Sequence, residues 1–332
     1  MNRFNKNIFM HPRLSGVIFS AALFLFYGVP GFAYAQSLPE QDEINNSAVF
    51  TLATGRPGST HAQVGEILCN VYNRQRDPNS PLCRSIYSPG GHQQLADMLS
   101  NKVHMAIIQS DVVAAAYMGK KQFKTNDQLR VLLPLHDQVM AAVIKDSAAN
   151  SRFDITSMLS KRVTITDSIR DGRFTLRRLF ATMGPSYINE NNIVEMTPAD
   201  QAQAICDDRF DIGFMILGHP NGAIQQGIHD CELKLVPFDF PKLRAVVESS
   251  RYLNMGKIPK DTYTGQMAII SAPSVAALLV TTDRFNHETG LAFINILRDN
   301  QSILRRLHRS LVDLDLNRRP TLVRHMKLFG QD

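Results

Sequence analysis

Four short turns in this sequence combine glycine, hydroxyl and imidazole groups that could bind a small anion. Each turn follows an apolar run, and three of them directly precede a segment with helical spacing. The backbone N–H groups and the dipole at a helix N-terminus attract negative charge, so such turns can hold a carboxylate. Paired glycines such as Gly90 and Gly91 also let an anion approach the backbone closely. The turns are residues 54–61, 88–94, 109–111 and 218–220.

Each turn also has a purely structural interpretation, in which the glycines make the turn and the Ser or Thr side chains cap the helix. For any single turn this interpretation is the simpler one. If several of the turns converge on one cleft, a ligand site becomes the better interpretation. Whether they converge depends on the elements that carry them.

The chain alternates between short apolar strands and segments with helical spacing. This βαβαβ order predicts an α/β fold with a parallel sheet. No long Pro, Gly or Ser linker divides the chain, so we expect short crossing strands to join two lobes. Ligands of open α/β sheets bind outside the carboxyl ends of the strands, where all four turns fall. The predicted strands are 50–53, 85–87, 105–108, 139–144, 163–165, 193–196 and 211–217, and residues 287–329 are predicted to be mainly helical.

The first 35 residues have the pattern of a signal peptide. Three basic residues precede an apolar stretch at 17–27, and an A-x-A cleavage site stands at 33–35. The alternative is a membrane anchor, but the apolar stretch is shorter than the roughly 20 residues that a spanning helix needs. We therefore expect export to the periplasm and a soluble mature protein that begins at Gln36.

The charge of the mature chain is ordinary. The whole chain has a net charge of +6, and the predicted signal peptide removes three basic residues and no acidic one. Blocks of five or more like charges are absent, and no basic stripe with interleaved aromatic residues stands out. Nucleic-acid binding proteins usually show such a stripe, so we expect no nucleic-acid partner.

Cysteine usage agrees with export. Pairing of neighbours along the chain predicts the disulfides Cys69–Cys83 and Cys206–Cys231, although four cysteines allow two other pairings as well. A zinc site is the alternative use of these residues. The spacings contain no C-x-x-C pair and no close histidine partner, so we expect no metal.

The usual catalytic motifs are missing from this sequence. It has no G-x-S-x-G elbow, Walker loop, H-E-x-x-H or G-x-G-x-x-G. The histidines are scattered, although His61 and His219 lie in candidate cleft turns. We therefore expect a binding protein without enzymatic activity and without a cofactor.

At these turns the sequence resembles the TAXI family, the solute receptors of TRAP-type transporters. The resemblance covers nearly the whole mature chain and includes the segments TLATGRPGSTHAQVGEI, SPGGHQQL and Gln109-Ser110-Asp111. The most specific stretch is ICDDRFDIGFMILGHPNGAI, followed by Cys231, which resembles the disulfide-bearing branch of the family. IPKDTYTGQ and ALLVTTD also fit. The segment from Thr166 to Arg173 departs from the G-S-G-T-like turn that the family usually has there.

The resemblance implies a two-lobed periplasmic-binding-protein type II fold with the ligand in a cleft between the lobes. Lobe 1 would comprise residues 48–137 and 272–332, and lobe 2 residues 138–271. The ligand would be a small organic anion, a carboxylate or an amino acid such as glutamate. A monomeric receptor would deliver it to the membrane subunits of a TRAP permease. Two alternatives are a sensory receptor that docks on a sensor kinase and a secreted enzyme on the same scaffold.

Position and resemblance together define a set of candidate ligand-binding residues. We expect those of the first lobe to face Ser168 and Arg173 of the second, where Arg173 could grip a second carboxylate bidentately. In the alternative, Arg173 points to solvent and balances Asp171. The candidates are Thr54, Gly55, Ser59, Thr60, His61, Gly90, Gly91, Gln94, Gln109, Ser110, Asp167, Ser168, Arg173 and His219.

Overall fold

The computed structural model describes residues 49–119, 126–146, 161–166, 176, 179–181, 192–250, 252–317 and 328. These residues belong to one compact unit, Pro39–Asp332. The predicted signal peptide and the candidates Asp167, Ser168 and Arg173 lie outside the described residues. Within the described part, no helix is long and apolar enough to cross a membrane.

The first half of the sheet has the strand order β2-β1-β3-β10-β4. Strand β1 runs parallel to β2 and β3, whereas β10 runs antiparallel to both β3 and β4. Every residue of β3 is buried, as expected for a strand covered by helices on both faces. The strands are β1 (Val49–Thr54), β2 (Leu82–Tyr87), β3 (Met105–Gln109), β4 (Leu129–Lys145) and β10 (Ile270–Thr282).

The second half repeats this arrangement with the order β6-β5-β7-β4-β8. Its strands are β5 (Val163–Thr166), β6 (Ile193–Met196), β7 (Ile212–Leu217) and β8 (Leu233–Val236). Strand β5 is parallel to β6 and β7, and β4 is the antiparallel strand between β7 and β8. The repeated arrangement confirms the predicted α/β class and the two-lobed periplasmic-binding-protein fold.

Strands β4 and β10 connect the two halves. They contain 17 and 13 residues, longer than the short crossing strands that we expected, because each of them pairs in both halves. The predicted strand at 139–144 starts at Leu129 instead. Proline is disfavoured inside a strand, so Pro134 made the first part of β4 hard to predict from the sequence. In the structure, a register shift at Leu135 accommodates this proline in the pairing of β4 with β10. Strand β9 (Asn254–Ile258) pairs with the first part of β10.

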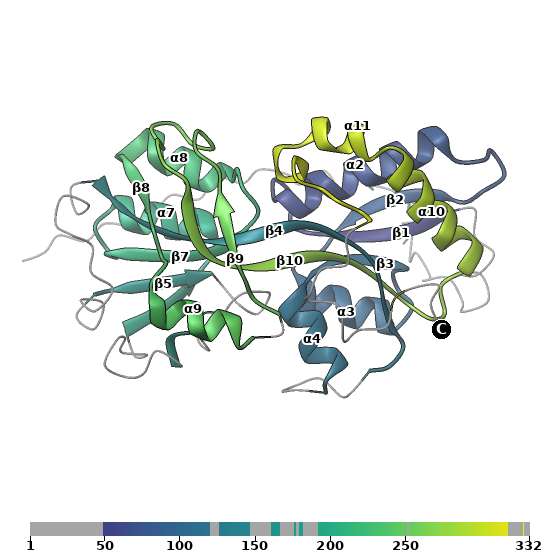
Figure 1. The fold of residues 1–332 in the computed structure, drawn as a ribbon, viewed down its shortest axis with the longest axis horizontal. Helices are drawn as coiled ribbons and strands as arrows, with labels where there is room; N and C mark the ends of the chain where they lie inside the picture. The colour runs from purple at the N-terminus through teal and green to yellow at the C-terminus, as the bar shows by residue number, and fades with distance from the viewer. Residues whose placement is uncertain are drawn as a thin grey trace, which may run out of the picture. The chain divides into compact units, whose positions relative to one another are not determined.

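The helices cover both faces of the sheet. They are α2 (Thr60–Gln75), α3 (Gly91–Leu99), α4 (Ser110–Tyr117), α7 (Pro198–Cys206), α8 (Gly222–Cys231), α9 (Pro241–Glu248), α10 (His287–Asp299) and α11 (Gln301–Leu307). In the first half, α2, α10 and α11 lie on one face and α3 and α4 on the other (Figure 1). The predicted helical C-terminal part is thus confirmed from His287 to Leu307, and a 3-10 turn follows at Arg309–Leu311.

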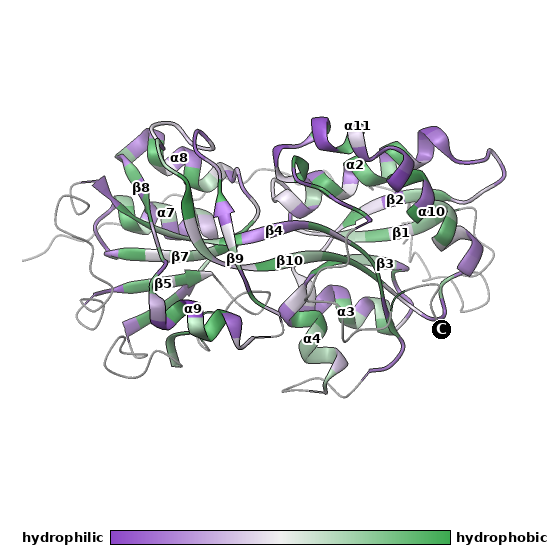
Figure 2. Cartoon of the chain, viewed as in Figure 1, coloured by the Kyte–Doolittle hydropathy of each residue, from purple (hydrophilic) through white to green (hydrophobic). Residues whose placement is uncertain are grey.

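The strands consist largely of hydrophobic residues, whereas the helices combine hydrophobic and hydrophilic residues (Figure 2). In the first half, the ring of Phe50 packs edge-on against Tyr72 and Phe293, with centroids 5.4 and 5.6 Å away. In the second half, Phe214 packs against Phe180 and Phe238, both at 5.1 Å. Each half therefore has an aromatic centre of its own.

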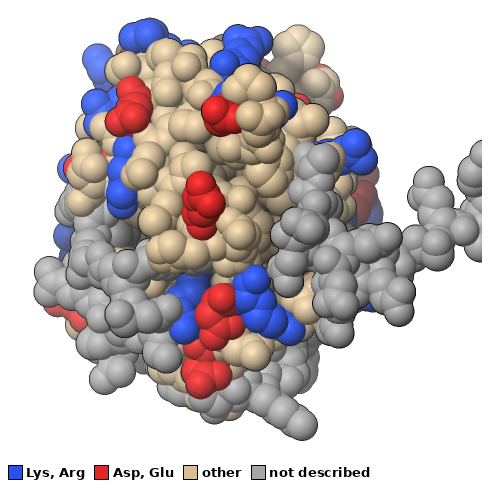
Figure 3. Space-filling view, turned by 90° about the vertical axis from the view of Figure 1, so that its right-hand side faces the viewer, with Lys and Arg blue, Asp and Glu red and all other residues tan. Residues whose placement is uncertain are grey.

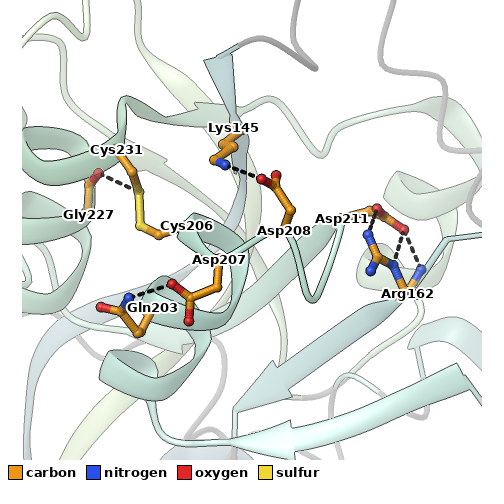
Figure 4. A network of polar contacts seen from close by, with 9 residues as sticks. All are labelled: Lys145, Arg162, Gln203, Cys206, Asp207, Asp208, Asp211, Gly227 and Cys231. Carbon is orange, nitrogen blue, oxygen red and sulfur yellow. Dashed lines mark hydrogen bonds and ion pairs between the residues drawn. A yellow bond between two sulfur atoms is a disulfide. The ribbon is translucent and has the colours of Figure 1, made fainter.

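Both predicted disulfides are confirmed, and the two other pairings are wrong. Cys69 of α2 bonds to Cys83 of β2, with Cα atoms 5.0 Å apart. Cys206 and Cys231, the last residues of α7 and α8, bond to each other with Cα atoms 5.5 Å apart (Figure 4). The second disulfide thus ties together the C-termini of neighbouring helices.

Charged side chains are mixed on the surface. On the end of the molecule shown in Figure 3, basic and acidic side chains are interspersed on a largely uncharged surface. Individual ion pairs join elements of the second half, such as Arg162 with Asp211 and Lys145 with Asp208, both at 2.7 Å (Figure 4). Exposed pairs of this kind contribute about 0–1 kcal/mol each, so they add little to the stability of the fold.

Candidate functional site

A pocket of about 150 Å³ lies where the carboxyl ends of the parallel strands of both halves meet. The first half contributes the turns after β1 and β2 and the last residue of β3, and the second half contributes the last residue of β5, the turn after β6, and the end of β7 with the turn that follows it. Gln138 joins them from the crossing strand β4. The lining residues are Gly55, Arg56, Ser59, Thr60, His61, Pro89, Gly90, Gln109, Gln138, Thr166, Thr197, Pro198, Ile216, Leu217, Gly218 and Asn221.

Five helix N-termini meet at this pocket, because five of its lining residues are N-caps. These are Ser59 of α2, Gly90 of α3, Gln109 of α4, Thr197 of α7 and Asn221 of α8. Three of them cap their helices through a side-chain oxygen, and Gly90 and Gln109 make no such bond. Each helix N-terminus is equivalent to about half a positive charge, so these five termini favour a negatively charged group in the pocket.

The charge of the described lining residues points to the same class of ligand. Arg56 is the one charged residue among the described lining residues, and none of them is Asp or Glu. It follows Gly55 in the turn between β1 and α2, and its side chain is exposed. The described wall therefore offers a guanidinium and helix N-termini to an anion, with no carboxylate to repel it.

A chain of buried polar side chains forms one wall of the pocket. Gln109 donates to the Oε1 atom of Gln138, and Nε2 of Gln138 contacts Nε2 of His61. Burial lowers the pKa of His61 to about 4, so this ring is neutral near pH 7 and can accept a hydrogen bond. The ring of His136 lies edge-on to it at 5.7 Å, and burial lowers the pKa of His136 as well.

The two halves touch each other directly at the pocket. The hydroxyl of Thr60, the first residue of α2, donates to the carbonyl oxygen of Gly218 at 3.1 Å. Gly218 follows β7 and belongs to the second half. Both residues line the pocket, and their hydrogen bond is buried.

His219 supports the pocket from behind and is not among its lining residues. Its Nε2–H donates to the carbonyl oxygen of Val139 at 2.9 Å, since that oxygen can only accept. The hydroxyl of Tyr263 then donates to Nδ1 at 2.6 Å and accepts the N–H of Asn221 at 2.9 Å. Burial lowers the pKa of His219 to about 4, which keeps this arrangement neutral.

Six candidate residues from the sequence line the pocket, and five other described candidates do not. The hydroxyl of Thr54 donates to the carbonyl of Ile86, and the amide of Gln94 donates to the carbonyl of Thr54. The hydroxyl of Ser110 donates to the carbonyl of Tyr252. The lining candidates are Gly55, Ser59, Thr60, His61, Gly90 and Gln109, and the described candidates that do not line the pocket are Thr54, Gly91, Gln94, Ser110 and His219.

Ten lining residues were not among our candidate residues, although Arg56, Pro89 and Gly218 lie within the predicted turns. For two of them the sequence does hold a signal, because both are N-cap residue types: Thr197 directly follows a predicted strand, and Asn221 directly follows the predicted turn 218–220. Gln138 carries no such local signal, since it lies within a strand and reaches the pocket only through the crossing of β4. The missing residues are Arg56, Pro89, Gln138, Thr166, Thr197, Pro198, Ile216, Leu217, Gly218 and Asn221.

Several solved structures are similar to this chain. One is the ligand-binding component of an ABC-type import system from Staphylococcus aureus with zinc bound, at 11% identity over 85% of each chain and a TM-score of 0.49. A mutant of ArgBP from T. maritima matches at 9% identity over 82% of this chain and 98% of that chain, with a TM-score of 0.48. The periplasmic aliphatic sulphonate binding protein SsuA from Escherichia coli matches at 11% identity over 83% and 77%, with a TM-score of 0.46.

The sequence itself matches a family model over most of its length. The match spans residues 52–323 and is to the NMT1-like family. This range contains all strands of both halves, except the first three residues of β1, and every described residue that lines the pocket. The chain belongs to the NMT1-like family.

Proposed function

We propose that this protein is a periplasmic receptor that captures a small organic anion in the pocket between its two lobes. The observation that carries the proposal is the convergence of five helix N-termini and Arg56 on one pocket. Carboxylates are the natural partners of such N–H groups and of a guanidinium. A carboxylate or an amino acid such as glutamate is the ligand class that we propose.

The lobes would comprise residues 48–137 with 272–332, and residues 138–271. Strands β4 and β10 cross between them, and Gln138 pairs with Val275 at this crossing. Bending of two paired strands would let the lobes open and close as units. A ligand that contacts both lobes would then have a higher affinity for the closed state and would shift the population toward it.

Export and delivery complete the proposal. Two disulfides fit an oxidising compartment such as the periplasm. The resemblance of residues 205–224 to the TAXI receptors supports delivery of the ligand to the membrane subunits of a TRAP permease. Docking of the closed form on a sensor kinase would use the same pocket and is the alternative that we retain.

Calorimetry with the mature protein, beginning at Gln36, tests the anion site. We expect at least one small carboxylate to bind, and Arg56→Ala to weaken it by about 1–3 kcal/mol, because this arginine is exposed and partly screened. Arg84→Ala is the matched control, since Arg84 is also exposed and does not line the pocket. Equal affinities for Arg56→Ala and the wild type would exclude Arg56 as an anion ligand.

A further inference from the structure

The contact between Thr60 and Gly218 joins residues 158 positions apart in the sequence. Thr60 is the first residue of α2 in the first half, and Gly218 directly follows β7 in the second half. Their hydrogen bond is buried, and Thr60 is only 4% exposed. This part of the pocket wall is therefore closed by the protein itself, independently of any ligand.

The contact has no room for a side chain at position 218. A Cβ atom there would lie 2.6 Å from Cγ2, 2.7 Å from Cβ and 2.8 Å from Oγ1 of Thr60. Carbon atoms in favourable contact are about 3.5–4.0 Å apart. Thr60 cannot turn away easily, because its branched Cβ restricts the side chain and is itself one of the clashing atoms. By contrast, a Cβ at Gly222 meets nothing within 4 Å.

The backbone around Gly218 is anchored on the other side. Leu217 pairs with Val139 of β4, and the ring of His219 donates to the carbonyl of the same Val139. Both sequence neighbours of Gly218, Leu217 and His219, are therefore held against Val139 of β4. A methyl group at position 218 would therefore be accommodated mainly by moving the start of α2 away, which means separating the two halves.

We propose that Thr60 and Gly218 form the closing contact of this receptor, and that the missing side chain at position 218 sets how far the lobes close. This inference rests on the proposed function where it concerns ligand affinity. The apparent affinity of a ligand falls in proportion to the fraction of protein that is in the binding-competent state. A substitution that keeps the lobes apart at this contact would lower the affinity for the ligand, although no ligand-binding group is removed.

Small-angle X-ray scattering of the ligand-free mature protein tests the closing contact directly. We expect Gly218→Ala to raise the radius of gyration and Gly222→Ala to leave it unchanged. The double variant Thr60→Gly with Gly218→Ala removes every clashing atom and should bring the radius back toward the wild-type value. A folded Gly218→Ala protein with the wild-type radius would overturn the proposal, because the clash would then be absorbed locally.

Calorimetry with L-glutamate, succinate and pyruvate supplies the second measurement. For a probe that binds the wild type, we expect Gly218→Ala to weaken binding by about tenfold or more, the factor by which the closed population falls. Unchanged affinity would overturn the link between the contact and ligand binding. If no carboxylate binds the wild type, the proposed anion receptor fails, while the scattering comparison still decides the closing contact.

Thr60→Val keeps the inference testable if Gly218→Ala does not fold. Valine has the shape of threonine but lacks the hydroxyl that donates to the Gly218 carbonyl. We expect this variant to open the protein more often and to weaken binding several-fold. A Thr60→Val protein with both the wild-type radius and the wild-type affinity would overturn the proposal.

Discussion

Replacing Tyr263 by phenylalanine should destabilise the protein by removing one hydroxyl that serves two partners. The hydroxyl donates to Nδ1 of His219 and accepts the N–H of Asn221. In Tyr263→Phe, the buried imidazole nitrogen loses its donor and cannot be reached readily by water, because His219 is 8% exposed. An unsatisfied buried group of this kind costs about 1–3 kcal/mol.

The second partner adds less. The backbone N–H of Asn221 is only partly buried, so water can replace the lost hydroxyl there. We therefore expect Tyr263→Phe to lower the free energy of unfolding by about 2–4 kcal/mol in total. Asn221 caps α8 at the pocket, so the same change should also loosen this wall.

Urea unfolding followed by circular dichroism measures this loss. Tyr87→Phe is the matched control, because Tyr87 is 56% exposed and its hydroxyl donates to the exposed Glu66. We expect the control to change stability by less than about 0.5 kcal/mol. A loss below about 1 kcal/mol in Tyr263→Phe would refute the reasoning, since it would mean that neither partner depends on the hydroxyl.

Three further predictions follow from the described contacts. Removing the disulfide by Cys206→Ala with Cys231→Ala should cost about 3–4 kcal/mol of unfolding free energy, as expected for a loop closed over 25 residues, and urea unfolding measures it. The free energy of unfolding should fall as the pH drops from about 6.5 to about 4. Over this range His61 and His219 bind protons in the unfolded chain, but burial keeps them neutral in the folded protein. The midpoint of thermal unfolding at pH 4.5 and pH 7 tests this, and an unchanged midpoint contradicts it. In His61→Gln, the pH dependence should become shallower, since one depressed pKa is lost; a slope equal to that of the wild type would show that the ring titrates normally.

The sequence alone identified the strands that begin and end with clear local signals. The alternation of apolar runs with Gly, Ser and Thr turns marked β1, β3 and β7 to within a residue or two. The same local chemistry predicted helices at the turns 54–61 and 109–111, and the structure shows N-caps at the pocket within them, Ser59 and Gln109. Export and order along the chain also favoured the correct disulfides.

Strands whose sequence lacks such signals were missed or shortened. Strand β10 contains Pro273 and a run of small residues, and the start of β4 contains Pro134, so neither resembles a regular apolar strand. Both are strands because each finds partners on two sides in both halves of the sheet. Pairing over such distances along the chain is a tertiary property that local residue preferences do not contain.

The tertiary structure also decided which of the polar turns share a pocket. Local sequence determined that Thr60 starts a helix and that a glycine follows β7, because caps and turns depend on neighbouring residues only. It could not determine that the Thr60 hydroxyl meets the Gly218 carbonyl, or that Gln138 reaches the pocket from a crossing strand. Those contacts depend on the relative position of the two halves of the sheet. The shared strands β4 and β10 set this position, and the packing of each half around its own aromatic centre does not.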